Sequence, residues 1–119
     1  MNTLNTEGTD RTFSLVLITQ AEATWHLLKA AVAGKTPVLH AILLTSDTAN
    51  TTVTIQYATE SDGTGAAALT GAMTLADNGG FLIPFCADPR GCIDAGAAGR
   101  VLGFTSATGL VFGYAIVSV

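Results

Sequence analysis

Two histidines and two cysteines are the side chains of this chain best suited to act as metal ligand, base or nucleophile. They are His26, His40, Cys86 and Cys92. A zinc site takes about four such ligands at regular spacing, which this set lacks. In the strand pairing expected below, His26 would lie near Leu44 and not opposite His40, and no general base is implied beside either cysteine. The residues therefore predict no metal site, no cofactor and no catalytic nucleophile.

The two cysteines flank a short loop that could bring them together. Cys86 and Cys92 are separated by the five residues ADPRG, in which Pro89 and Gly91 favour a turn. A disulfide here would close a small ring and contribute about 2–3 kcal/mol. Folding in a cytoplasm favours reduced thiols instead. The sequence leaves both states open, with the disulfide forming late if the protein ends up outside the cell.

Most acidic side chains lie in predicted turns and loops, where turn capping, solvation and local ion pairing are their ordinary roles. Asp47 is expected to cap a turn, and Arg90 to pair locally with its acidic neighbours. Calcium would need oxygen ligands at a regular spacing, which the candidate residues do not have. Those candidates are Asp77, Asn78, Asp88 and Asp94. Glu60 and Asp62 are predicted to be exposed loop carboxylates and not an acid–base pair.

Aromatic side chains are the remaining group that could bind a ligand directly, as a platform for a sugar. The candidates are Trp25, Phe81, Phe85, Phe104, Phe112 and Tyr114. In a small β-sandwich, however, aromatic residues more often fill the core, and that is the role we expect for them.

The composition argues for a partner surface and against nucleic acid. The chain has 119 residues, enough for one domain, and only 12% of them are charged, against about 25% in a typical soluble domain. Its net charge is −4 and its five cations are scattered, so no nucleic-acid footprint is expected. The glycines Gly91, Gly96 and Gly99 lack the strand-then-helix setting of a phosphate loop. A surface so poor in charge favours a homo-oligomer or a larger assembly.

Neither a membrane span nor a secretory signal is expected. A spanning helix needs an apolar run of about 18 residues. The best candidate, Trp25–Leu44, is interrupted by Lys29 and Pro37. The first twelve residues are polar, which does not fit a signal peptide, so we expect synthesis in a cytoplasm.

The elements that must position these residues are β-strands, and the clearest lie in Thr36–Thr59. Val38–Leu44 is apolar on both faces, so both faces should be covered, one of them by another subunit. Residues 51–59 alternate, with Val53 and Ile55 on one face and threonines on the other. We expect the two runs to pair as a β-hairpin at the centre of a sheet.

Further strands are predicted on both sides of this stretch. Trp25–Val32 also has helix formers but sits between strands, so a strand is favoured. Pro84 places its strand at an edge or a bulge, and the last two strands are expected to pair as a hairpin. The predicted segments are 12–20, 25–32, 69–75, 81–85, 100–106 and 110–119. Eight strands with turns rich in Gly, Asn and Asp indicate one antiparallel β-sandwich, jelly-roll-like, over residues 12–119, preceded by a flexible arm at residues 1–11.

The order of motifs resembles that of small jelly-roll decoration, or cement, proteins of tailed bacteriophage heads. The shared features are a Ser-Asp-Thr-Ala turn before a Thr-Val-Thr strand, the run LTGAMTLADNGGFLIPF (Leu69–Phe85), and the glycine-rich stretch Ala95–Leu102. The similarity covers roughly Val38–Val119. One departure is the loop after Pro89, where Gly91-Cys92 stands in place of Gly-Trp. Cys86 and Cys92 are expected to take over the local fixing role of the absent Trp.

The resemblance implies a non-enzymatic virion protein on the outer capsid surface, trimeric and bound to the major capsid protein. It implies no contact residues. The alternative is a β-sandwich module of a tail or fibre that binds a host-surface glycan through exposed aromatic side chains.

Overall fold

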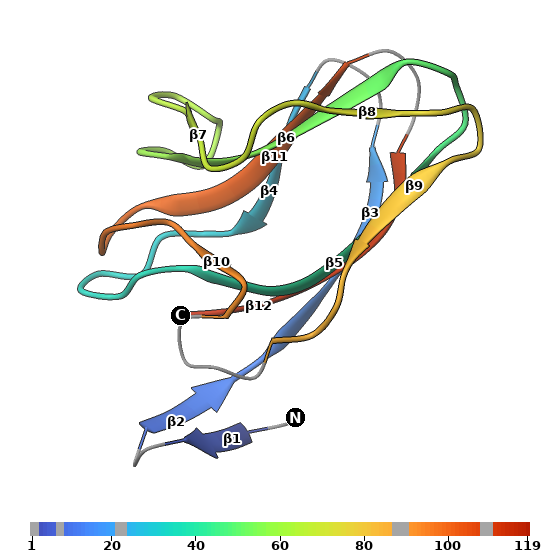
Figure 1. The fold of residues 1–119 in the computed structure, drawn as a ribbon. Helices are drawn as coiled ribbons and strands as arrows, with labels where there is room; N and C mark the ends of the chain where they lie inside the picture. Colours follow the sequence, from blue (N-terminus) through green and yellow to red (C-terminus); the bar gives the residue numbers. More distant parts are fainter. Residues whose placement is uncertain (1–2, 7–8, 21–23, 87–90, 108–110) are drawn as a thin grey trace.

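The computed structural model describes residues 3–6, 9–20, 24–86, 91–107 and 111–119, and these residues contain β-strands and no helix. Two antiparallel sheets pack face to face, as Figure 1 shows. The fold class expected from the sequence, an all-β antiparallel sandwich, is therefore confirmed.

Each sheet is built around a long strand from the end of the chain. The β12 sheet has the order β3-β12-β5, and β9 and β10 share the outer side of β5. Its strands are β3 (Ser14–Gln20), β5 (Val38–Ser46), β9 (Gly80–Ile83), β10 (Ile93–Asp94) and β12 (Val111–Ser118). The β11 sheet has the order β4-β11-β6, and β7 and β8 share the outer side of β6. Its strands are β4 (Thr24–Lys29), β6 (Thr51–Ala58), β7 (Ala67–Ala68), β8 (Met73–Leu75) and β11 (Val101–Ala107).

The eight principal strands follow a jelly-roll order. Without the two-residue strands β7 and β10, the sheets read β3-β12-β5-β9 and β4-β11-β6-β8. Most consecutive strands thus lie in opposite sheets, and each of the four-strand layers mixes early and late parts of the chain.

The hairpin predicted at Thr36–Thr59 is wrong, although both of its strands are present. β5 pairs with β12, β9 and β10, whereas β6 pairs with β11, β7 and β8. The turn between them crosses from one sheet to the other, because the apolar sides of both strands face each other across the core. For the same reason the predicted hairpin of the last two strands is wrong, since β11 and β12 lie in opposite sheets. The expected proximity of His26 and Leu44 is also wrong, because β4 pairs with β11.

The core fills the space between the sheets with inward side chains of both layers. Ile42 and Leu44 are fully buried in the core cluster. Val38 is 3% exposed but lies outside that cluster, beneath the loop at Gly91. The remaining large members of the core cluster come from nearly every principal strand: Ile18, Leu28, Leu39, Val53, Ile55, Leu75, Leu102, Phe104, Val111 and Val117.

The chain begins with a small hairpin that lies outside both sheets. β1 (Thr3–Thr6) pairs with β2 (Thr9–Thr12), and β2 runs on through Phe13 into β3. Figure 1 shows this hairpin projecting beyond the end of the sandwich. The sequence predicted an arm at residues 1–11 but no strands in it; its flexibility stays a prediction.

Candidate binding surface

The outer side of the β12 sheet carries a continuous row of apolar side chains. Leu17 on β3 is opposite Tyr114 on β12, Tyr114 is opposite Leu43 on β5, and Leu43 is opposite Leu82 on β9. Leu15 and Ile116 form a second cross-strand pair beside this row, and Phe112 lies beyond it. We call this surface the apolar face and define it as Leu15, Leu17, Leu43, Leu82, Phe112, Tyr114 and Ile116.

The apolar face is open to solvent in the single chain. Leu17 is 75% exposed, Leu15 64%, Leu82 57% and Phe112 37%. Strand alternation explains this, because Val16 and Ile18 take the inward side of β3. The sequences of β3, β5, β9 and β12 contain no Asp, Glu, Lys or Arg. Exposed apolar side chains that lie side by side, unlike single ones scattered over a surface, often mark an interaction site, so the apolar face is the first candidate for a contact with another protein.

The outer side of the β11 sheet has a different character. Thr54 is opposite Thr105, and Thr52 is opposite Thr74. The indole of Trp25 lies over Gly103, whose missing side chain leaves room for the ring, and its Nε1 donates a hydrogen bond of 2.9 Å to the carbonyl of Ser61. We call this surface the threonine face and define it as Thr52, Thr54, Gln56, Thr74, Thr105 and Trp25.

A buried histidine closes one end of the β12 sheet. His40 is fully buried, with Nδ1 2.8 Å from the carbonyl oxygen of Cys86 and Nε2 2.7 Å from the hydroxyl of Ser118. The rings of Phe13 and Phe85 contact it at centroid distances of 4.7 and 5.9 Å. The β5–β12 register shifts here, which leaves His40 as the additional residue of a β-bulge. This arrangement could not be predicted from the sequence, because a bulge depends on the partner strand.

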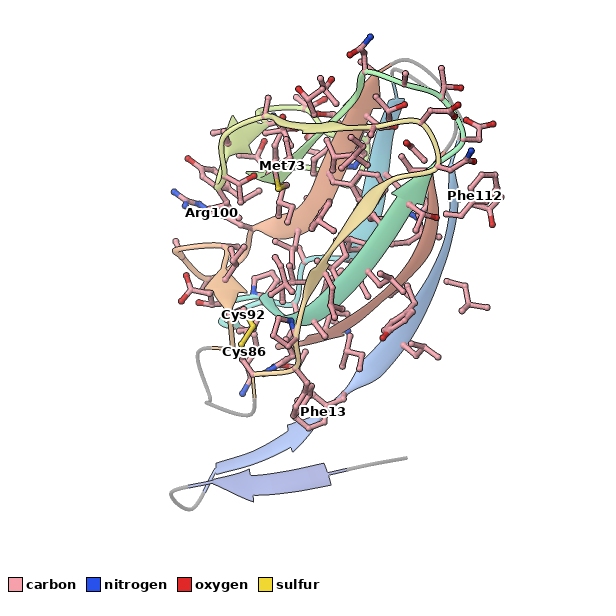
Figure 2. All side chains as sticks on the ribbon, turned by 45° about the vertical axis from the view of Figure 1, so that its right-hand side comes forward. Phe13, Met73, Cys86, Cys92, Arg100 and Phe112 are labelled. Carbon is pink, nitrogen blue, oxygen red and sulfur yellow. A yellow bond between two sulfur atoms is a disulfide. The ribbon has the colours of Figure 1, made fainter. Side chains whose placement is uncertain are left out.

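The structure joins Cys86 and Cys92 in a disulfide, with a Cα–Cα distance of 5.4 Å. The loop is also tied to β5, because the backbone N–H of Cys86 donates to His40 and that of Cys92 donates to Leu39. Gly91 adopts φ +60°, and a side chain there would collide with Val38 and the Leu39 carbonyl. Closing so short a loop contributes about 2 kcal/mol. Figure 2 shows the disulfide close to Phe13.

The other candidates for chemistry do not form a site. His26 lies on β4, its ring 5.1 Å from that of Phe104, and burial lowers the pKa of its imidazole. Asp62 accepts a hydrogen bond from the N–H of Thr64, and its hydrogen bonds to Thr64 lower the pKa of its carboxyl group. Asp94 likewise caps a turn by accepting from the N–H of Gly96. Among the described residues no three His, Cys, Asp or Glu side chains gather as a metal site. Asp88 and Arg90 lie outside the described residues.

The aromatic candidates divide between core and surface. Phe104 is fully buried, and Phe81 packs against the core cluster. Phe85 and Phe112 are instead 49% and 37% exposed. In Figure 2, Phe112 and Phe13 lie near opposite ends of the β12 sheet. The expectation of a core role therefore holds for only part of the set.

Comparison with protein-family models, with curated proteins and with solved structures gave no match to this chain. In the part of the chain that the structure describes, no helix is long and apolar enough to cross a membrane.

Proposed function

We propose that this chain is a non-enzymatic structural protein of a virion, a decoration protein that oligomerises on the outer surface of a phage head and stabilises it. The observation that carries the proposal is the apolar face: seven apolar side chains over four uncharged strands, four of them at least 37% exposed. The motif order supports the same function class. The major capsid protein is the proposed partner, and a trimer is the assembly that the resemblance implies.

Burial of apolar surface is the proposed source of stabilisation. Removing an exposed Leu or Phe side chain from water contributes about 1.5–3 kcal/mol, and association costs part of that sum. A face with Leu15, Leu17, Leu82 and Phe112 exposed therefore suffices for a stable contact with a complementary apolar surface. Such contacts repeat over a symmetric shell, so small gains for each subunit add to the barrier against rupture.

The proposal is tested by heating phage heads with and without the protein. We expect heads that carry it to release their DNA at a higher temperature than bare heads. A variant with Leu15→Thr, Leu17→Thr and Phe112→Thr should fail to bind and give no protection. Equal rupture temperatures for decorated and bare heads would contradict the function.

A second candidate function follows from the exposure of Phe85 and Phe112, at 49% and 37%. Exposed aromatic rings can stack on sugars, so a tail or fibre module that binds a host glycan is the alternative. Specific binding on a glycan array, lost in Phe112→Ala, would favour it over the decoration protein.

A further inference from the structure

The β12 sheet has one edge without the usual protection against pairing. A free sheet edge offers unpaired N–H and C=O groups, and proteins normally shield such edges by short strands, proline, charge or bulges. β3 is the outermost strand on one side of this sheet. It runs for seven residues, SLVLITQ, without charge or proline, and its register with β12 is unbroken.

The other edges of the two main sheets carry the protection that β3 lacks. β4 ends at Lys29, and its register with β11 shifts between Leu102 and Gly103. β9 has four residues and is followed by Pro84. The strands β7, β8 and β10 have only two or three residues each. The contrast singles out β3 as an edge that another strand can extend.

We propose that two copies of this chain pair through their β3 strands, antiparallel and about a two-fold axis at Leu17. Leu17 is the central residue of Ser14–Gln20 and the most exposed of the large apolar side chains. The pairing places Leu17 against the partner's Leu17, and Val16 against the partner's Ile18. Both β12 sheets thereby join into one sheet, and two apolar faces become one surface.

A second copy fits this edge because the strand is self-complementary, as an isologous contact requires: about Leu17 it sets Leu17 against Leu17 and Val16 against Ile18, apolar against apolar. The chain has a net charge of −4, so an edge with acidic residues would repel its own copy. β3 has none. The inference rests on the proposed oligomer, and it adds a two-fold contact to the trimer that the resemblance implies.

Cysteine cross-linking tests the contact. In Leu17→Cys the two new thiols would lie opposite each other, at a Cβ separation of about 5 Å, and a short thiol-specific cross-linker should yield a covalent dimer. The native cysteines are held as a disulfide and serve as the background in the wild type. Leu82→Cys is the matched control: it lies on the same face but on β9, about 34 Å from its copy across seven strand spacings, and should give no dimer.

A charge at the edge supplies the second test. Leu17→Lys should weaken self-association at least tenfold in analytical ultracentrifugation, because two lysines would meet at the axis, whereas Leu82→Lys should leave it unchanged. Both side chains are more than half exposed, so neither change removes core packing.

The outcomes separate this contact from the proposed function. Wild-type oligomers without a Leu17→Cys cross-link, or equal cross-linking of Leu82→Cys, would overturn the β3 contact and leave the decoration function standing. A wild type that stays monomeric at every concentration would also overturn it. The heating of phage heads decides the function independently of either result.

Discussion

The two outer faces of the sandwich differ, although both cover the same core. The apolar face exposes Leu15, Leu17, Leu82 and Phe112, whereas the threonine face presents pairs such as Thr54 and Thr105. Threonine is well suited to an exposed strand, because its branched carbon favours the extended backbone and its hydroxyl remains hydrated. Leucine at an exposed strand position has no polar group that water can hydrate. The fold therefore requires neither face to be apolar, and the proposed assembly contact on one side would account for the difference.

Replacing exposed side chains of the apolar face by threonine should have the largest effect, a loss of binding to phage heads. The triple variant Leu15→Thr, Leu17→Thr, Phe112→Thr gives the apolar face the kind of side chain that the threonine face carries. Losing three buried contacts of at least about 1 kcal/mol each should weaken assembly on phage heads by about 100-fold or more. The fold should remain, because Leu15 and Leu17 are mostly exposed, where a substitution changes stability by only about 0.5 kcal/mol, whereas Phe112→Thr also loses some packing. Binding to bare heads and thermal unfolding of the free protein give the two measurements.

The matched control adds apolar groups to the opposite side. Thr52→Val, Thr54→Val and Thr105→Val should leave binding to heads unchanged, since that face is proposed to stay in solvent. The assignment of the two faces would be reversed if the variant of the apolar face bound heads normally or if this valine variant lost binding.

Strand positions could be predicted from the sequence, but strand partners could not. Alternation in residues 51–59 and the apolar run Val38–Leu44 mark strands correctly, because side chains alternate along any strand. The turn between them contains Asn50 at φ +62°, and local turn signals do not distinguish a hairpin from a crossing between sheets. Only the requirement that both apolar sides meet across the core decides for the crossing, and that is a property of the whole chain.

The sequence predicted a covered sheet face but did not show which side chains form it. The run Val38–Leu44, apolar on both faces, predicted that another chain would cover part of a sheet. Which side remains open depends on register, because Phe112 and Val111 are equally apolar but only Val111 lies in the core. The His40 bulge and the β1–β2 hairpin were not predicted. The bulge depends on the partner strand, and the polar residues of the hairpin show no periodic apolar pattern.

Glycine substitutions should have effects of intermediate size, and their effects on stability should differ between the two sheets. In the β12 sheet a Cβ at Gly113, which has φ +155°, would collide with the Leu43 carbonyl. We expect Gly113→Ala to destabilise the fold by about 3 kcal/mol and to lower Tm by about 10 °C. In the β11 sheet Gly103→Ala should cost less, because the backbone atom that its Cβ meets, the His26 carbonyl oxygen, is less close than the Leu43 carbonyl oxygen at Gly113, and Gly103 does not have a positive φ.

The control for both glycines is Gly71→Ala, where a Cβ meets nothing within 4 Å. Its Tm, from thermal unfolding monitored by circular dichroism, should match that of the wild type. Equal losses in all three variants would show that strand spacing in the β12 sheet is not tighter than elsewhere.

The smallest expected effect concerns the histidine of the β11 sheet. Burial lowers the pKa of His26, so the folded chain favours its neutral form. The unfolded chain binds more protons between the folded pKa and the ordinary value of about 6.5, so stability rises with pH through that window and is lost as pH falls through it. Tm measured between pH 7.5 and 5 should therefore drop slightly more in the wild type than in His26→Gln. His40 and the carboxylates are common to both proteins and cancel in the difference, so identical pH profiles would show that His26 does not contribute.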